Sequence, residues 1–264
     1  ALELRLAVDL ALGRAAQVLA FLDNAKERLG DESRAILRAR ALQALGKPAD
    51  ALIELRALAS SAPENSKLAV TLAQTLAATG NLQQAERELS AFLERHPSDA
   101  DALQARGEIR FRGGAAKQAI EDLQAALSKA PPSWAPINRT VAEILIGEAA
   151  LASGNADLAR AQVAKLEKVS PGLARTRLIR AHLALLDGRY GEAIDDLQQV
   201  VESMPDNAGP QYLLIDALLR SGNTVRATEL LERRLAADPS DAFARLQLAR
   251  VLLSQNKPDR VVQL

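Results

Sequence analysis

Three residue types recur along this chain at a common interval of 34 residues, broken once by an interval of 40. The positions are Gly46, Gly80, Gly114, Gly154, Gly188 and Gly222; Ala51, Ala85, Ala119, Ala159, Ala193 and Ala227; and Pro63, Pro97, Pro131, Pro171, Pro205 and Pro239. A fixed period of this size is typical of stacked helical hairpins, because one hairpin cannot bury its apolar face alone. The interval therefore predicts a quasi-linear array of helix pairs, with each glycine at the turn inside a pair and each proline after its second helix.

The pattern between residues 32 and 264 resembles the tetratricopeptide repeat (TPR) family. That family has small residues at positions 8 and 20 of a 34-residue unit, an apolar residue at 24 and proline at 32. Position 8 holds Ala39, Ala73, Gly107, Gly147, Ala181, Ile215 and Ala249, and position 24 holds Leu55, Leu89, Leu123, Val163, Leu197 and Leu231. The resemblance implies an all-α, right-handed superhelical solenoid of antiparallel helix pairs. It implies binding of a protein or peptide segment but does not name the partner, since one fold hosts many functions.

The period also predicts how the single solenoid domain is divided. Residues 1–31 form a degenerate N-terminal repeat, 32–133 three regular repeats, 134–139 an insertion, 140–241 three further regular repeats, and 242–264 a truncated seventh unit. For the insertion we expect either an elongated helix over about 135–153 or a loop that stands off the stack. The chain begins with alanine and ends on apolar residues, including Val261 and Val262, so we expect it to be part of a longer protein.

Composition excludes several functional classes. Lys plus Arg and Asp plus Glu both number 33, so no basic surface for nucleic acid is expected. The chain has no cysteine, which excludes disulfides and thiolate chemistry. No apolar run is long enough to span a membrane. We find no phosphate-binding glycine loop, HExxH or Gly-x-Ser-x-Gly motif, and therefore expect no enzyme activity, cofactor or metal.

Few titratable residues stand out. His96 precedes a proline, and we interpret it as an exposed loop residue. The adjacent carboxylates Glu121-Asp122 and Asp195-Asp196 fall on second helices, where we expect a solvated face. Asn and Asp residues stand where helix caps are expected, at Asn65, Asp99, Asn207 and Asp241 before first helices and at Asn81, Asn155 and Asn223 before second helices.

One stripe of the first helices is the candidate binding surface. In the family, positions 2, 5, 9 and 12 line a concave groove. Here position 9 is polar in every unit, and positions 5 and 12 are largely apolar. The candidate groove residues are Arg40, Gln74, Gln104, Glu108, Phe111, Ile144, Glu148, Leu178, His182, Tyr212, Asp216 and Arg250.

Two interpretations of this stripe stay open. Position 12 could pack within the stack while position 9 is polar only because it meets water. Alternatively, the stripe is a trough whose apolar rows bury anchors of a partner, while Glu108, Glu148 and Asp216 meet its basic residues.

Trp134 has two interpretations as well. It is the only tryptophan and lies in a proline-rich insertion. It is either a hydrophobic plug on neighbouring helices or an interaction anchor for a partner.

A narrower resemblance concerns residues 174–264, which look like the long TPR proteins of bacterial exosortase (PEP-CTERM) and exopolysaccharide systems. The basis is Ala193-x3-Leu197-Gln198-Gln199-Val200, Tyr212-Leu213-Leu214 and Ala244-Arg245-x2-Leu248-Ala249. This implies a periplasmic or lipid-anchored location, whereas a generic TPR protein would be cytoplasmic. Two alternatives compete: a substrate-docking module of a larger enzyme such as a glycosyltransferase, and a cytoplasmic scaffold that self-associates through exposed solenoid ends.

Overall fold

The computed structural model describes residues 2–24, 29–205 and 207–262, and within these ranges helices joined by short turns are the only regular secondary structure, with no strand. Contacts divide the chain into two compact units, Ala1–Gly154 and Asn155–Leu264, here called the N-terminal and C-terminal units. The N-terminal unit contains α1 (Leu2–Ala11), α2 (Ala15–Asn24), α3 (Asp31–Ala44), the short 3-10 helix η2 (Pro48–Ala51), α4 (Leu52–Ser61), α5 (Ser66–Ala78), α6 (Leu82–Arg95), α7 (Ala100–Arg112), α8 (Ala116–Lys129) and α9 (Pro136–Ala152). The C-terminal unit contains α10 (Ala156–Val169), α11 (Ala174–Leu186), α12 (Tyr190–Ser203), α13 (Ala208–Arg220), α14 (Thr224–Ala237), α15 (Ala242–Ser254) and α16 (Pro258–Val261).

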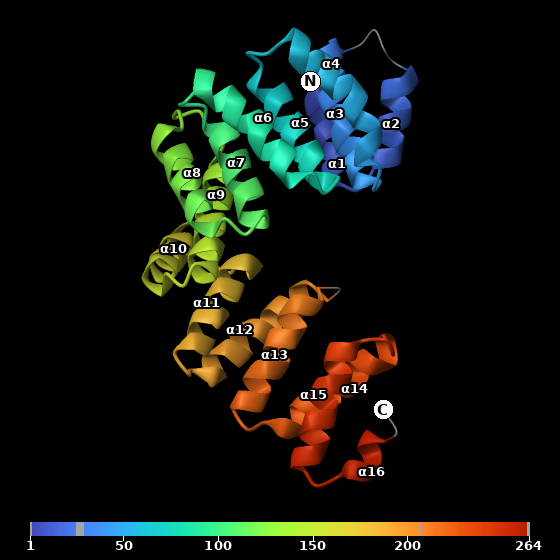
Figure 1. Ribbon diagram of the computed structural model, residues 1–264, viewed down its shortest axis with the longest axis vertical. Coiled ribbons are helices and arrows are strands. Elements are labelled where there is room, and N and C mark those ends of the chain that lie inside the picture. The colour runs from blue at the N-terminus through green and yellow to red at the C-terminus, as the bar shows by residue number, and fades with distance from the viewer. Residues whose placement is uncertain (1, 25–28, 206, 263–264) are drawn as a thin grey trace. The chain divides into compact units, whose positions relative to one another are not determined.

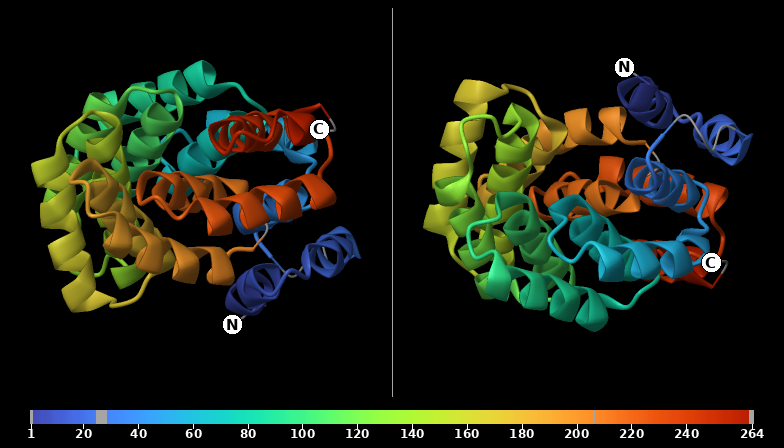
Figure 2. Two further views of the ribbon diagram at one scale, coloured as in Figure 1. Left: turned by 90° about the horizontal axis from the view of Figure 1, so that it is seen from below. Right: turned by 90° about the horizontal axis from the view of Figure 1, so that it is seen from above.

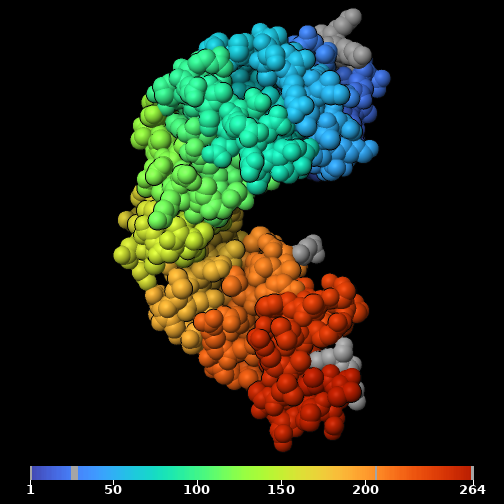
Figure 3. Space-filling model, in the orientation of Figure 1, coloured from blue at the N-terminus to red at the C-terminus, as the bar shows by residue number. Residues whose placement is uncertain are grey.

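Within the units, helices of a predicted pair contact each other, as α5 does with α6, α7 with α8, and α11 with α12 (Figures 1 and 2). The predicted pair of repeat 140–173, α9 and α10, is divided between the two units. In the N-terminal unit each first helix also contacts the next one, in the order α1, α3, α5, α7 and α9. These five helices therefore form one layer of the unit. Figure 3 shows the atoms of this unit, coloured blue to yellow-green, closely packed on the face in view. Residues 25–28 of the predicted N-terminal repeat lie outside the described ranges.

The ends of the helices follow local sequence signals. Gly80 and Gly114 follow first helices with φ of 85° and 84°, a left-handed conformation that side chains other than glycine rarely adopt. Six of the seven predicted cap residues accept a backbone N–H at the start of their helix, while Asn81 does not. A cap of this kind stabilises a helix by about 1 kcal/mol.

The small residues of the repeat lie where two helix backbones approach. At position 20, Ala85 and Ala119 are fully buried, and at position 8 Ala39 and Ala73 are too. A Cβ added to Gly107 would lie 2.8 Å from Cγ of Leu123, closer than packed atoms come. The spacing of small residues therefore sets how closely the two helices of a pair pack.

The insertion forms the long helix rather than a projecting loop. α9 has 17 residues and begins at Pro136, whose missing N–H is no loss in the first turn. Trp134 is only 6% exposed, and its indole N–H donates to Oδ1 of Asp101 at 2.7 Å. The guanidinium of Arg139 lies 5.6 Å from the centre of its ring. Of the two interpretations of Trp134, this geometry supports the plug, because a buried and hydrogen-bonded indole offers little surface to a partner.

The interpretation of the paired carboxylates as a solvated face is wrong for one member of each pair. Asp122 is 4% exposed and Asp196 is 6% exposed, while their neighbours Glu121 and Asp195 are exposed. Each buried carboxylate is bound by an arginine of the preceding first helix: Arg106 donates to Asp122 at 2.7 and 2.9 Å, and Arg180 Nε donates to Asp196 at 2.6 Å. Paired in this way, a buried charge avoids most of its desolvation cost. The hydrogen bond with Asp196 also raises the pKa of the Arg180 guanidinium.

These ion pairs occur in alternate repeats. Position 7 is arginine and position 23 is acidic in repeats 32–65, 100–133 and 174–207, where the pairs are Arg38 with Glu54, Arg106 with Asp122, and Arg180 with Asp196. The intervening repeats have Leu72, Ile146 and Leu214 at position 7. Position 7 therefore alternates between arginine and an apolar residue along the chain. Position 23 does not follow it in every repeat: it is Glu88 and Gln162 in two of the intervening repeats, and only repeat 208–241 is apolar at both positions, with Leu214 and Leu230.

His96 differs from the expectation too. Its side chain is 31% exposed rather than free in solvent, its Nε2 lies 2.6 Å from Oε2 of Glu64, and its ring lies 4.5 Å from the ring of Phe92. It is a contact between neighbouring hairpins of the N-terminal unit.

Candidate functional site

The layer of first helices in the N-terminal unit contains a recess of about 310 Å³, here called the α3–α7 groove. Its lining comes from positions 2, 5, 6 and 9 of α3, α5 and α7 and from the start of α9: Ile36, Arg40, Lys67, Val70, Thr71, Gln74, Asp101, Gln104, Ala105, Glu108 and Asn138. Positions 2, 5 and 9 share one helix face because a helix turns by about 100° per residue. Four of the predicted groove residues, Arg40, Gln74, Gln104 and Glu108, lie together here.

Five polar side chains of this groove are available to a ligand, whereas Asp101 accepts from Trp134 and Asn138. Within the described part of the chain, no ion pair or hydrogen bond joins the side chain of Arg40, Lys67 or Glu108 to another residue, and the same holds for the amides of Gln74 and Gln104. Ile36 and Val70, both half-buried, form the apolar part of the lining. The groove thus combines apolar contact area with unused donors and acceptors.

Charge is separated along the groove. The cations Arg40 and Lys67 stand on α3 and α5, and the carboxylates Asp101 and Glu108 stand on α7. Packed helix axes lie about 8–10 Å apart, so the two ends of the groove are separated by roughly 16–20 Å. An extended peptide advances about 3.3 Å per residue, and five or six residues would span this distance.

The other candidates in the N-terminal unit have structural contacts. Phe111 packs on a cluster of Ala116, Ala119 and Ala149, and Ile144 is 5% exposed. Glu148 also has an interaction within the chain. For these residues, and for position 12 in particular, the geometry supports the interpretation as packing within the stack.

In the C-terminal unit three of the four polar candidates, His182, Tyr212 and Asp216, are bonded within their own neighbourhood. His182 Nδ1 lies 2.9 Å from the carbonyl oxygen of Leu178, and Arg220 Nε donates to Asp216 at 2.9 Å. Leu178 packs against a buried cluster, and Arg250 is exposed on α15. The predicted row of acidic side chains therefore leaves only Glu108 without a partner in the described chain.

Tyr212 belongs to a buried polar cluster. Its hydroxyl donates to Asp241, which also accepts from Arg234 Nε at 2.9 Å and from the Ala244 N–H at 2.9 Å. Burial by itself would raise the pKa of Asp241, but these hydrogen bonds outweigh it and lower the pKa to about 2. Phe243 packs edge-on to the Tyr212 ring at 4.7 Å. The cluster joins α13, α14 and α15, so its role is to hold the hairpins together.

Lys67, Asp101 and Asn138 line the groove but were not among the predicted site residues. Lys67 and Asp101 occupy position 2, which the family pattern assigns to the groove, so the sequence pattern could have identified both as groove residues. Asn138 lies on the first turn of α9, in the part added by the insertion, and no repeat position corresponds to it. No cluster of metal-ligating side chains and no helix able to cross a membrane occurs among the residues that the structure describes.

Stacked helical hairpins whose first helices pack in one layer define the class of helical repeat proteins. Tetratricopeptide repeat models match residues 70–133, 144–208 and 184–243, together more than half of the chain. The chain therefore belongs to the tetratricopeptide repeat family, and its all-α solenoid fold is the one predicted.

Solved structures agree with this fold. A chain of the anaphase-promoting complex hetero-tetramer Cut9-Hcn1 matches 92% of this chain with a TM-score of 0.72 and 16% identity, and this chain spans 47% of its length. The match with PilF of Pseudomonas aeruginosa covers 83% of this chain and 97% of the PilF chain, with a TM-score of 0.68 and 16% identity. YrrB, described as a TPR protein with an unusual peptide-binding site, matches 72% of this chain and is covered over 95%, with a TM-score of 0.51 and 17% identity. No curated protein sequence matches this chain.

Proposed function

We propose that this chain is a non-enzymatic scaffold whose α3–α7 groove binds an extended segment of a partner protein. The observation that carries the proposal is the set of unpaired polar side chains, Arg40, Lys67, Gln74, Gln104 and Glu108, around one recess of about 310 Å³. Polar side chains that face solvent are hydrogen-bonded to water, which the polar groups of a ligand can replace. A groove that keeps several of them unpaired, beside apolar Ile36 and Val70, matches the needs of a peptide with both kinds of group.

The charges of the groove define the partner segment. An acidic residue would lie at the α3–α5 end, where Arg40 and Lys67 offer cations, and a basic residue would lie beside Glu108 on α7. Opposite charges at the two ends also set the direction of the bound segment, because the reversed peptide would place like charges together. Membership of the TPR family supports a peptide ligand, and so does the likeness to YrrB with its unusual peptide-binding site.

Charge reversal tests the proposal with defined peptides. The probe is a panel of short synthetic peptides with an acidic residue and a basic residue separated by three or four apolar or small residues, together with the same sequences reversed. Glu108→Lys should weaken binding about tenfold or more, the effect of losing one charge-assisted contact. Arg40→Glu combined with Lys67→Glu should do the same through the acidic residue.

Arg87→Glu is the matched control, because Arg87 is exposed on α6 and is absent from the groove. It should leave affinity unchanged. Peptide binding that survives both groove reversals, or a panel in which no peptide binds, would contradict the proposed function.

An export or exopolysaccharide setting is a finer part of this proposal, supported by the resemblance of residues 174–264 to such proteins. It predicts that the full-length protein fractionates with the cell envelope. Recovery in the cytosolic fraction would contradict it.

Self-association is a second candidate function, supported by three apolar side chains on one stripe of α15. Phe243, Leu246 and Leu253 are each about half exposed. Light scattering at two concentrations should show a mass that rises with concentration, and Leu246→Lys should abolish the rise. A constant monomer mass would contradict self-association.

A further inference from the structure

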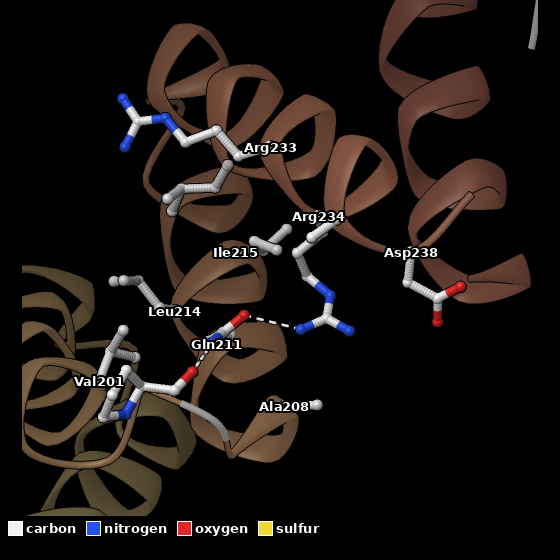
Figure 4. Close-up of a pocket in the computed structure, with 11 residues that line it drawn as sticks. Val201, Ala208, Gln211, Leu214, Ile215, Arg233, Arg234 and Asp238 are labelled. Atoms are coloured by element: carbon white, nitrogen blue, oxygen red, sulfur yellow. Dashed lines mark hydrogen bonds between the residues drawn. The ribbon is translucent and has the colours of Figure 1, made fainter. Parts of the chain in front are cut away.

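The C-terminal unit contains a second recess, of about 390 Å³, between α12, α13 and α14 (Figure 4). Val201, Leu214, Ile215 and Leu230 supply its apolar walls. An adjoining recess of about 260 Å³ shares Val201, Leu214, Leu230 and Arg233, and continues along α14 as far as Arg226. The combined depression, here called the α12–α14 recess, follows α14 from Arg226 to Asp238, roughly 18 Å at 1.5 Å per residue.

The recess lies where this repeat has apolar residues at both position 7 and position 23. In the preceding repeat these positions hold the Arg180–Asp196 ion pair, but here they are Leu214 and Leu230. The shorter leucine side chains do not fill the space that an arginine and its carboxylate occupy. Both leucines line the recess and give it an apolar floor.

A second difference from the preceding repeat, at positions 4 and 26, leaves one arginine without a partner. In the preceding repeat, positions 4 and 26 are joined by the hydrogen bond from Arg177 to Gln199. Here position 4 is Gln211, whose oxygen accepts from Arg234 at 2.7 Å and whose amide donates to the Pro205 carbonyl at 2.6 Å. Arg233 at position 26 is therefore left exposed, with no ion pair or hydrogen bond to the described residues.

The other charged groups around the deeper part of the recess already have hydrogen-bond partners. Arg234 donates to Asp241, and Asp238 accepts from the N–H and hydroxyl of Ser240 at 2.9 and 2.6 Å. Figure 4 shows Arg234 directed toward Gln211, while the guanidinium of Arg233 lies on the other side of the recess. Arg233 is thus the one charged side chain of the deeper part with no bond to the described residues, while the adjoining part is also lined by the carboxylates of Glu202 and Glu229.

The recess is distinct from the family's groove stripe. At about 100° per residue, position 7 lies on the opposite side of a first helix from positions 5 and 9. On α13 these are Leu214 on one side and Tyr212 and Asp216 on the other. A ligand in the recess would consequently bind independently of anything held along the groove stripe.

We propose that the α12–α14 recess binds a partner protein segment in which a large apolar side chain stands next to a carboxylate. The apolar side chain would lie against Leu214, Ile215 and Leu230, and the carboxylate would accept from Arg233, whose planar guanidinium can donate two parallel hydrogen bonds. A depression about 18 Å long suits a peptide of several residues better than a compact small molecule.

The experiment measures binding of short synthetic peptides in which Leu, Phe or Trp is followed by Asp, alongside matched sets with Asn or Lys in place of Asp. Affinity is taken from fluorescence polarisation, and the site from methyl NMR shifts of Leu214, Leu230 and Val201. Asp peptides should bind about tenfold or more tightly than Lys peptides, and should shift those methyl signals.

Two variants separate loss of the site from loss of the fold. Arg233→Glu, at an exposed position, should weaken the Asp peptides about tenfold and remove their advantage over Lys peptides. Leu214→Arg combined with Leu230→Asp rebuilds the ion pair of the preceding repeat, and should fill the recess and abolish binding while helicity is retained. Arg87→Glu makes the same charge change on α6, outside the recess, and should have no effect.

Three results would overturn the proposal: no binding by any Asp peptide, equal binding of Asp and Lys sets, or equal losses with Arg233→Glu and Arg87→Glu. If the peptides bind but shift signals of the α3–α7 groove instead, the recess is likewise excluded.

Discussion

Asp122→Leu should destabilise the N-terminal unit by about 3 kcal/mol, although the substitution adds apolar surface. Asp122 is 4% exposed and accepts from Arg106 at 2.7 and 2.9 Å and from Arg110 at 2.9 Å. Removing it leaves the half-buried Arg106 with Ser90 at 3.2 Å, while Arg110 keeps Glu86 at 2.8 Å. Breaking one side of a buried ion pair costs about 3–5 kcal/mol, and the partial exposure of Arg106 places this case at the lower end.

Replacing both members of the pair should cost less than replacing the carboxylate alone. Arg106→Leu combined with Asp122→Leu gives this repeat the two leucines at positions 7 and 23 that repeat 208–241 has as Leu214 and Leu230. No uncompensated charge is then buried beside α8, so we expect the double variant to be about 2 kcal/mol more stable than Asp122→Leu.

Urea unfolding followed by tryptophan fluorescence is the assay. Trp134, the only tryptophan, is bonded to Asp101 on α7 and so reports on the same unit. Glu121→Leu is the matched control, because Glu121 stands next to Asp122 but is exposed. Its replacement should change the free energy of unfolding by no more than about 0.5 kcal/mol. Strict additivity of the two single substitutions, or equal effects of Asp122→Leu and Glu121→Leu, would refute the reasoning.

Three further predictions concern packing and charge. Trp134→Phe should cost about 1–2 kcal/mol in urea unfolding monitored by circular dichroism, because the carboxylate of Asp101 loses a hydrogen bond; an unchanged midpoint would contradict the buried plug. Gly107→Ala should destabilise by about 1 kcal/mol net, since overpacking against Leu123 outweighs a gain of about 1 kcal/mol in helix propensity, and a rise in melting temperature would disprove this. The pKa of Asp241 is lowered to about 2, so its stabilisation is present above about pH 4 and is lost as pH falls toward 2. In an acid titration, the Asp241→Asn variant should lack the loss of stability that the native chain shows as pH falls from about 4 toward 2.

The sequence alone determined the hairpin repeat, its turns and most of its caps. These features depend on residues within a few positions of each other, such as Gly114 after a first helix or Asp99 three residues before the N–H that it binds. The face of the first helices that lines the groove was predicted for the same reason, because helical spacing fixes which side chains share a face.

Which side chains are free, and which are occupied, was decided by the tertiary structure. Asp122 meets its arginine across 16 residues and Trp134 meets Asp101 across 33, and composition cannot show that such groups face each other. The alternation of arginine and apolar residues at position 7 was present in the sequence as a signal, but its meaning depends on position 23 of the facing helix. Glu108 and Arg233 are therefore candidate contacts only because the folded chain gives their neighbours other partners, and that allocation follows from packing between helices rather than from spacing along one.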